Sequence, residues 1–279
     1  MTAVLNSNTI SLNAQRNTTT SQGSLAVAMQ RLSSGLRVNS AKDDAAGMAI
    51  AERMSTQVRG MNVAVRNAND GISLAQTAEG ALGKVSDSLQ RMRELSVQAR
   101  NATNTTTDLD SIGKEFGELG KEIQRVLGGT TFNGKAIIGA QAGTQTFQIG
   151  ANTTTNDVVD VATTDLTADA SITAVTGSSI SNTDTATSLA TVIDNIDKAI
   201  TTVSSQRATL GASQNRFDAV IANLQVSVEN QTAARSRILD TDYAAETANL
   251  SRAQILQQAG TAMIAQANQL PQQVLALLR

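Results

Sequence analysis

Cysteine, histidine and tryptophan are all missing from this chain of 279 residues, and proline occurs once. Without cysteine the chain forms no disulfide, and without histidine it has no His-based triad, no HExxH zinc site and no imidazole proton relay. Aromatic residues make up 2% of the sequence, and the remaining apolar residues are mostly Ala, Val, Ile and Leu. This composition suits narrow seams between helices better than a bulky core, and it predicts neither an enzyme nor a cofactor.

Strong charge and long apolar runs are lacking too. The formal net charge is −2, and no basic patch stands out, so we expect no nucleic-acid partner. Residues 1–16 do not combine a basic segment with an apolar run, so we expect no cleaved signal peptide. No stretch reaches the roughly 18 apolar residues that cross a bilayer, so we expect no membrane span.

Apolar residues that recur every seven positions are the strongest positive signal. The first series is Leu189, Ile196, Val203, Leu210, Phe217 and Leu224. The pattern returns near the end at Leu256, Met263, Leu270 and Leu277, with Gly260, Ala267 and Val274 as a second set. Because this spacing keeps one stripe on one side of a helix, the stripe is expected to face another helix.

The first half of the chain predicts three helices. One covers residues 4–34, although the polar, β-branched stretch 17–22 weakens helical propensity there. A second is expected over about residues 42–100. Asn39 or Ser40 marks its start, with the acids Asp43 and Asp44 in its first turn, and the helix is expected to continue through Asn-Asp-Gly at 69–71. A third is expected from an N-cap at Asp108 to about residue 127.

The middle of the chain changes from a period of 3.6 to a period of 2. Asn133-Gly134 predicts the turn of a short β-hairpin, and Phe147 with Ile149 predicts another strand. Residues 151–187 are rich in Thr, Asp, Ser and Asn, and are read as either a small exposed β excursion or a loosely ordered loop. Helical heptads then run to about residue 237, and a last helix is expected from about residue 245.

The predicted fold is therefore mainly α. A long antiparallel bundle or coiled coil is formed by the two halves of the chain, with a small β-hairpin region near 130–150 and a short polar middle. Neither terminal helix has a sequence neighbour to pair with, so the two are expected to pair with each other. We expect a terminal coiled coil from 1–41 with 240–279, a helical rod from 42–150 with 188–239, and a variable region at 151–187.

Two motifs in these terminal segments carry a resemblance to a known family. Residues 31–47 read RLSSGLRVNSAKDDAAG, residues 251–260 read SRAQILQQAG, and residues 275–279 read LALLR. These motifs resemble the N-terminal and C-terminal signatures of bacterial flagellins, and the resemblance covers roughly 1–150 and 188–279. It implies a structural subunit that polymerises into the flagellar filament outside the cell, with the terminal coiled coil lining the inner tube and the rod forming the outer tube.

The resemblance also implies partners. These are other copies of the chain, an export chaperone that holds the C-terminal helix, and hook-junction and cap proteins. The resemblance further implies secretion through the flagellar channel. The alternatives left open are a hook–filament junction protein, which shares the terminal helices, and a non-filamentous coiled-coil adaptor. Ser and Thr in 151–187 are candidate O-glycosylation sites or a solubilising composition.

The terminal stripes allow two interpretations: a monomeric helical hairpin, or a pair with a second face that packs neighbouring copies. The resemblance favours the second. The expected self-assembly seam consists of Leu25, Met29, Leu32, Leu36, Leu256, Met263, Ala267, Leu270, Val274 and Leu277. We also expect the termini of the free monomer to be loosely ordered, because a two-helix pair with an Ala- and Gln-rich surface buries little.

In the flagellin family the segment around residues 90–95 contacts the animal innate-immune flagellin receptor. The matching positions here are Arg91, Leu95 and Glu115. The segment 90–95 can also be read as an ordinary solvated helix face with one seam residue. The acids at 43–44 and 240–242 are read as helix caps or inter-subunit charge pairs rather than as catalytic or metal-binding carboxylates.

Overall fold

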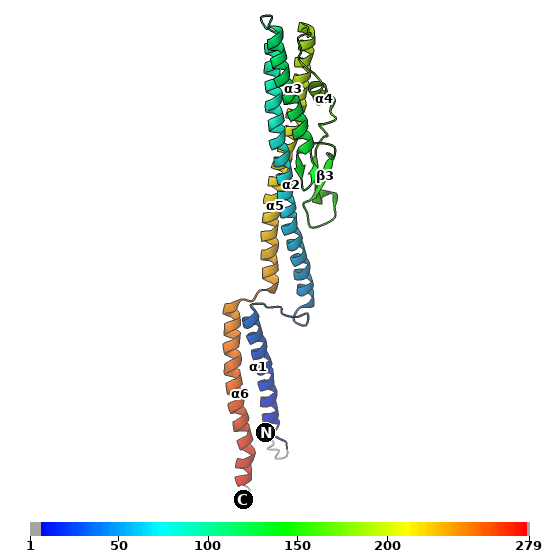
Figure 1. Ribbon diagram of the computed structural model, residues 1–279. Helices are drawn as coiled ribbons and strands as arrows, with labels where there is room; N and C mark the ends of the chain where they lie inside the picture. The colour runs from blue at the N-terminus through cyan, green and yellow to red at the C-terminus, as the bar shows by residue number, and fades with distance from the viewer. Residues whose placement is uncertain (1–6, 278–279) are drawn as a thin grey trace. The chain divides into compact units, whose positions relative to one another are not determined.

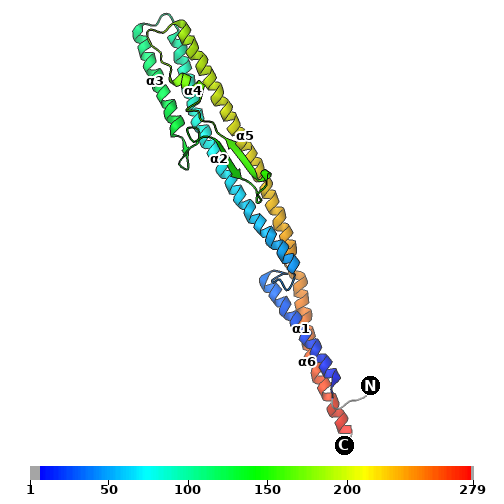
Figure 2. The same ribbon diagram turned by 90° about the vertical axis from the view of Figure 1, so that its right-hand side faces the viewer.

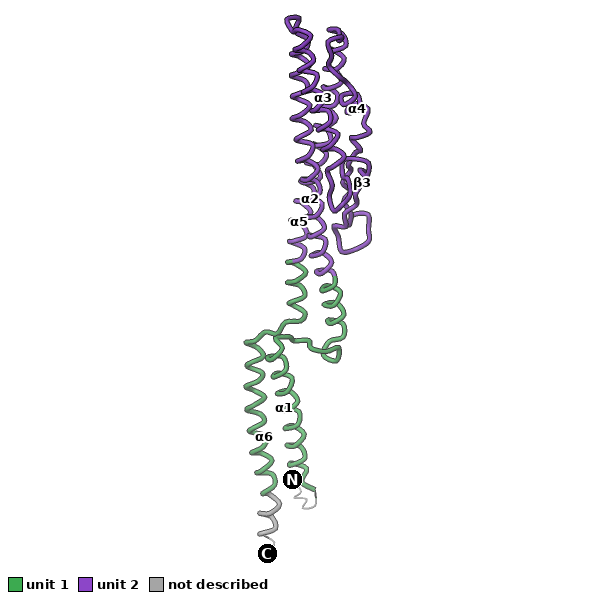
Figure 3. The backbone as a smooth tube through the Cα atoms, viewed as in Figure 1, with its two compact units in different colours: residues 1–56, 229–279 green, residues 57–228 purple. Residues whose placement is uncertain are grey.

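The computed structural model describes the backbone of residues 7–277 and the side chains of residues 7–269. The chain divides into two compact units, residues 1–56 with 229–279 and residues 57–228 (Figure 3). Both units therefore combine segments from the two halves of the sequence. The functional division into an inner-tube domain, a rod and a variable region remains a prediction, since compactness alone does not test it.

Helices dominate the described residues, as predicted, and the strands form two small antiparallel pairs. The helices are α1 (Thr9–Ser34), α2 (Ala45–Ala99), α3 (Thr106–Gly129), α4 (Ala170–Thr176), α5 (Ala186–Leu239) and α6 (Tyr243–Leu277), with a 3₁₀ turn, η1 (Thr155–Asp157). The strands are β1 (Thr131–Phe132), β2 (Lys135–Ala136), β3 (Thr144–Gln148) and β4 (Val158–Ala162).

In the unit of residues 57–228, α2 and α5 run side by side (Figure 1 and Figure 2). The heptad series on α5 is buried from Leu189 to Phe217, and Leu224 is half-buried. On α2 the facing stripe includes Leu82, Leu89 and the fully buried Ser96, whose hydroxyl donates to the Met92 carbonyl at 2.8 Å. The seven-residue spacing therefore did predict a seam between helices, and its polar member is satisfied within its own helix.

The α2 helix continues without a break through residues 69–71, as predicted. Gly71 faces Phe217 of α5, and a Cβ added at Gly71 would lie 2.6 Å from the Phe217 ring. Phe147 of β3 meets Phe217 edge-on, with ring centroids 5.6 Å apart and an interplanar angle of 84°. Although Asn-Asp-Gly resembles a turn, Gly71 in it leaves room for the Phe217 ring. Packing at this point therefore outweighs the local preference for a turn.

Two predicted helix starts were wrong. The acids Asp43 and Asp44 precede α2 instead of lying in its first turn, and Asp44 accepts from the Gly47 amide at 2.8 Å. The N-cap of α3 is Thr105, and Asp108 is the third helical residue of a capping box with it. In both cases the prediction assigned an acid that binds a free backbone amide to the wrong position relative to the start of the helix.

The predicted hairpin is confirmed. Strands β1 and β2 flank a turn at Asn133 and Gly134, whose φ values are 49° and 79°. Strand β3 pairs antiparallel with β4, in register from Thr144 with Ala162 to Gln148 with Val158.

The segment 151–187 differs from the expected exposed excursion or loose loop. It supplies buried apolar side chains to the same core as α2, α3 and α5, namely Val159, Val161, Leu166, Ile172, Val175 and Ile180. The buried Gln206 of α5 donates to the Ala162 carbonyl at 3.0 Å and accepts from the Thr164 hydroxyl at 3.1 Å. The many Thr, Asp and Ser residues concealed this alternation of buried and exposed positions.

The close contact between Gly71 and Phe217 gives a direct test of the core. We expect Gly71→Ala to destabilise the chain by about 1–3 kcal/mol, because its methyl group would overlap the Phe217 ring. Gly80→Ala, in the same helix, meets nothing within 4 Å and should stabilise by about 0.5–1 kcal/mol through helix propensity. Urea unfolding followed by circular dichroism measures both. Equal effects of the two substitutions would contradict this account of the α2–α5 seam.

Candidate functional site

The terminal helices α1 and α6 pair with each other, as predicted, in the unit of residues 1–56 and 229–279 (Figure 1). They are antiparallel. Asn8 donates to the Ala267 carbonyl at 2.8 Å near one end, and Arg31 lies 3.8 Å from Glu246 at the other. Between them the Thr18 side chain lies against Gly260, where an added Cβ would approach its hydroxyl oxygen to 2.5 Å.

Small and polar residues dominate the interface between α1 and α6. Positions at heptad spacing that are buried or half-buried are Ser11, Ala14, Thr18, Ser21, Leu25, Ala28 and Leu32 on α1, and Glu246, Leu250, Ala253, Gln257, Gly260, Ile264 and Ala267 on α6. Burying a Leu or Phe side chain contributes about 1.5–3 kcal/mol, whereas Gly, Ser and Ala contribute far less. The pair is therefore held close together but weakly.

The polar stretch 17–22, which weakened the helix prediction, lies inside α1. Side-chain hydroxyls there donate to carbonyls four residues earlier; Thr18 to Ala14 at 2.9 Å and Ser21 to Asn17 at 3.0 Å are examples. These bonds satisfy the hydroxyl groups without interrupting the helix.

The residues expected to form the self-assembly seam fall into two groups. Leu25, Leu32 and Leu36 are half-buried, and Ala267 is 2% exposed. Met29, Leu256 and Met263 are exposed by 57%, 51% and 58%. The side chains of Leu270, Val274 and Leu277 lie outside the described residues. Sequence reasoning missed Ser11, Thr18 and Glu246, because it looked for large apolar side chains; the heptad spacing of small residues was the available signal.

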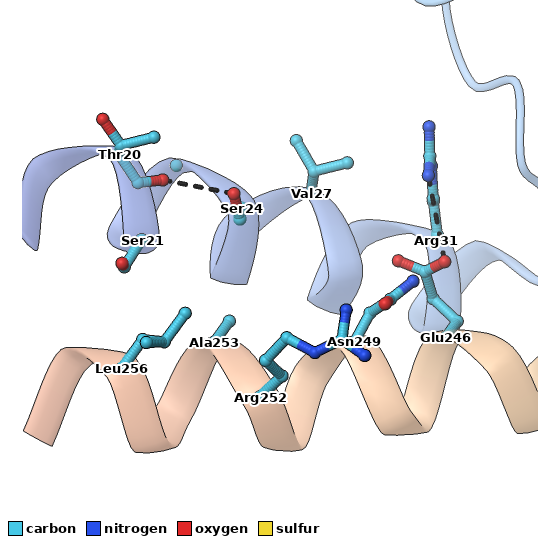
Figure 4. Close-up of a pocket in the computed structure, with 11 residues that line it drawn as sticks. Thr20, Ser21, Ser24, Val27, Arg31, Glu246, Asn249, Arg252, Ala253 and Leu256 are labelled. Carbon is cyan, nitrogen blue, oxygen red and sulfur yellow. Dashed lines mark hydrogen bonds and ion pairs between the residues drawn. The ribbon is translucent and has the colours of Figure 1, made fainter. Parts of the chain in front are cut away.

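One side of the α1–α6 pair is hollowed by two adjoining grooves, of about 670 and 580 Å³. Ser21 and Leu256 line both, so the grooves form one face, which we call the groove face. Its large apolar members are Ile10, Val27, Leu256 and Met263, all between 41% and 58% exposed. Figure 4 shows one groove, with the Arg31–Glu246 ion pair at one end and Leu256 at the other.

A second cluster lies on α2 and α3, in the other unit. Arg91 donates to Glu115 at 2.8 Å and to Glu94 at 2.9 Å, and these hydrogen bonds raise the pKa of the Arg91 guanidinium, with Glu115 the larger cause. Both Arg91 and Glu115 are about half-exposed. Leu95 is only 2% exposed and belongs to the core, so a receptor contact through Leu95 does not fit the structure. The stripe of α2 turns Leu95 inward while Arg91 faces outward.

Within the motif at residues 31–47, residues 35–44 form a folded loop between the end of α1 and the start of α2. The Ser34 hydroxyl accepts from the Leu36 amide at 3.1 Å and from the Asn39 side chain at 2.8 Å. Asp43 accepts from the Asn39 and Ser40 amides at 3.2 and 2.9 Å, and from the Ser40 hydroxyl. These bonds, chiefly those from Ser40, hold the pKa of Asp43 below its usual 3.8.

Chemistry of other kinds finds no support in the described part of the chain. Within residues 7–277 no group of three or more acidic side chains is placed to hold a metal ion. Among these same residues, no helix is both long and apolar enough to cross a membrane. The paired terminal helices, with large apolar side chains left along an open groove face, define the class of coiled-coil subunits that bury surface by association.

The sequence comparisons specify the family within that class. Residues 5–146 match the model of the bacterial flagellin N-terminal helical region, and residues 193–278 match that of the C-terminal helical region. The chain therefore belongs to the bacterial flagellin family, whose members are structural subunits of the flagellar filament and not enzymes.

Relatives match along their whole length. The flagellin of Halalkalibacterium halodurans is 45% identical over 276 residues, which cover 99% of this chain and all of that protein. The flagellin of Xenorhabdus nematophila is 43% identical over 321 residues, with both chains fully covered. Among solved structures, a putative flagellar hook-associated protein of Vibrio parahaemolyticus aligns with a TM-score of 0.59 and 14% identity over 71% of this chain and all of that one. At that identity the likeness shows the fold alone.

The loop at residues 31–47 yields a pH-dependent prediction. Because its folded pKa is depressed, the Asp43 carboxylate stabilises the loop above about pH 3.8, and this contribution is lost as pH falls through the folded pKa. Asp43→Asn should therefore lower the urea midpoint near neutral pH, and the difference from the unaltered chain should shrink below about pH 3.8. Asp70→Asn, exposed on α2, is the control. A difference that persists unchanged in acid would exclude ionisation as its cause.

Proposed function

We propose that the groove face of the α1–α6 pair is where neighbouring copies of this flagellin meet in the filament. The observation that carries this is the division of the terminal heptads. Mostly small residues face the partner helix, while Leu256 and Met263, at 51% and 58% exposure, are left outside. A monomeric hairpin would gain more by turning the large side chains inward.

Assembly then buries the apolar surface of the groove face that folding leaves exposed. The groove face of one copy and a different face of its neighbour form a heterologous contact, and repetition of a contact that does not close gives an open helical polymer. On this proposal the terminal pair lines the inner tube and the helical rod forms the outer tube. The termini of the free monomer are then loosely ordered, because the stripe of small residues stabilises them little.

Two alternatives predict different products. A hook–filament junction protein shares the terminal helices but forms no long filament, and a coiled-coil adaptor forms small closed oligomers. Full-length relatives named flagellin, at 43–45% identity, support the filament subunit over both. The hook-associated structure supports the junction alternative only through its fold, at 14% identity.

Family membership supports a proposal for secretion and for the remaining partners. The chain is proposed to leave the cell through the flagellar export channel, with a chaperone that holds the C-terminal helix, and to meet hook-junction and cap proteins at the filament ends. The absence of cysteine suits a chain that travels unfolded, because no disulfide can form on the way.

The surface around Arg91 and Glu115 is proposed to contact the animal innate-immune flagellin receptor. Both side chains are about half-exposed and present a charged surface across α2 and α3. Arginine is enriched among the residues that dominate binding energy at interfaces. Because Arg91 and Glu115 also bind each other, truncating either side chain would change the local structure and the surface together. A test of receptor contact therefore has to keep the ion pair.

Filament formation tests the groove face. We expect the double variant Leu256→Asn, Met263→Asn to yield no long filaments, because the apolar area it would bury between copies is removed. The matched control is Val97→Asn, Val226→Asn, two comparably exposed residues outside the groove face, at 52% and 58%. Electron microscopy after addition of filament seeds shows whether long filaments form. A chain that lacks residues 245–279 is imaged alongside for comparison. Normal filaments from the first double variant would exclude the groove face as the contact.

Receptor binding is tested by exchanging the two charges. In the double variant Arg91→Glu, Glu115→Arg the cross-helix ion pair remains possible, but the surface that faces a receptor is reversed. We expect the half-maximal concentration in receptor reporter cells to rise at least tenfold, about 1.4 kcal/mol. Arg93→Glu, Asp197→Arg makes the same exchange at the ion pair between α2 and α5, whose shortest N–O distance is 2.7 Å. Equal responses from the two exchanges would rule out a specific role for Arg91 and Glu115.

A further inference from the structure

The flagellin signature at residues 31–47 does more in this structure than connect two helices. Residues 35–38 run alongside the short linker between α5 and α6, and the two segments form an antiparallel bridge that pairs Leu36 with Asp240. The Arg37 amide donates to the Leu239 carbonyl at 2.6 Å, and the Thr241 amide donates to the Gly35 carbonyl at 3.0 Å. We call this arrangement the linker clamp.

Side chains reinforce the linker clamp from the α1 side. The Arg37 guanidinium donates to the Ile238 carbonyl at 2.6 Å, so it binds a carbonyl in the last turn of α5 that the helix itself leaves free. Gly35 has a φ of +72°, a left-handed conformation that side chains disfavour, and an added Cβ would lie 3.0 Å from the Tyr243 hydroxyl. Val38, three residues after Gly35, is buried, with 4% of its surface exposed.

The α1–α6 seam by itself specifies its register poorly. Thr18 lies against Gly260, and one heptad further along α6 the next residue of the stripe, Ala267, is also small. A slip by seven residues, about 10.5 Å of helix, would again oppose larger residues of α1 to Gly and Ala. The Arg31–Glu246 pair, 3.8 Å apart with Glu246 8% exposed, lies at the same end of the seam as the linker clamp, so its resistance to a slip adds to that of the clamp.

The chain that joins α1 to α2 has enough length to permit the slip. Residues 35–44 would span up to about 33 Å if extended, but hydrogen bonds from Asn39 to Ser34 and Leu36 fold them back. We propose that the linker clamp sets the register of α1 against α6. It fixes the end of α1 to the residues that precede α6, and the seam of small residues then closes from that point. This role does not depend on whether the chain polymerises.

Cysteine cross-linking tests the register directly, since the natural chain has no cysteine. The pair Thr18→Cys, Gly260→Cys reports the observed register, and the pair Thr18→Cys, Ala267→Cys reports a one-heptad slip. Each pair is oxidised in the full-length chain, and the intrachain product is measured by mass spectrometry. Because oxidation traps only paired helices, the ratio of the two products reports register even where pairing is transient. We expect the observed-register product to exceed the slipped one by about tenfold or more.

Each pair is then combined with Gly35→Ala, which forces a side chain into the left-handed position, or with the control Gly23→Ala in α1, where an added Cβ meets nothing within 4 Å. We expect Gly35→Ala to lower the product ratio at least about fivefold and Gly23→Ala to leave it within about twofold. Equal ratios in these two chains would overturn the proposal, and so would equal yields of both products in the unaltered background.

A second variant decides the case in which Gly35→Ala abolishes pairing and both products disappear. Arg37→Ala removes the guanidinium bond to Ile238 but keeps the backbone bridge, so a partial fall in the product ratio is expected. Arg16→Ala, exposed on α1, is its control. If Arg37→Ala leaves the ratio as Arg16→Ala does, the linker clamp does not set the register.

Discussion

Pairing between helices from opposite ends of the sequence is the constraint on which this structure depends. Residue 8 is bonded to residue 267, residue 31 to residue 246, and residue 93 to residue 197. A helix as long as α2 or α5 cannot bury its apolar stripe against itself, so each stripe requires the other half of the chain. Because these pairings span most of the sequence, neither half has a complete core alone.

The two compact units solve this problem with different side chains. Between α2 and α5 the seam contains Leu, Val and Phe, and it is closed by β3, β4 and the segment after them. Between α1 and α6 the seam contains mostly Ser, Ala, Thr and Gly, so the helices approach closely and leave Leu256 and Met263 outside. The α2–α5 seam therefore buries large apolar side chains, whereas the α1–α6 pair leaves large apolar side chains exposed, as the proposed contact between copies requires.

The candidate surfaces follow the same logic. Around Arg91 the heptad places charges outward and Leu95 inward, so of the three positions expected to contact a receptor only Arg91 and Glu115 are exposed. At the linkers, Gly35 and Arg37 bring main-chain groups of the two connecting segments into hydrogen-bonding range. The signature of the family thus forms a local structure as well as a recognisable motif.

By itself the sequence determined the elements and their seams. Heptads at Leu189 to Phe217 predicted the buried face of α5, Asn133-Gly134 predicted the hairpin turn, and the signatures at 31–47 and 251–260 predicted the family, because local geometry and spacing are properties of neighbouring residues. Tertiary structure decided what depends on a distant partner. Only the ring of Phe217 explains Gly71 within a continuous helix, and only the core explains the order in 151–187. Likewise, only the pairing of α1 with α6 shows which stripe faces inward, since a helix carries several stripes at the same spacing and the partner selects among them.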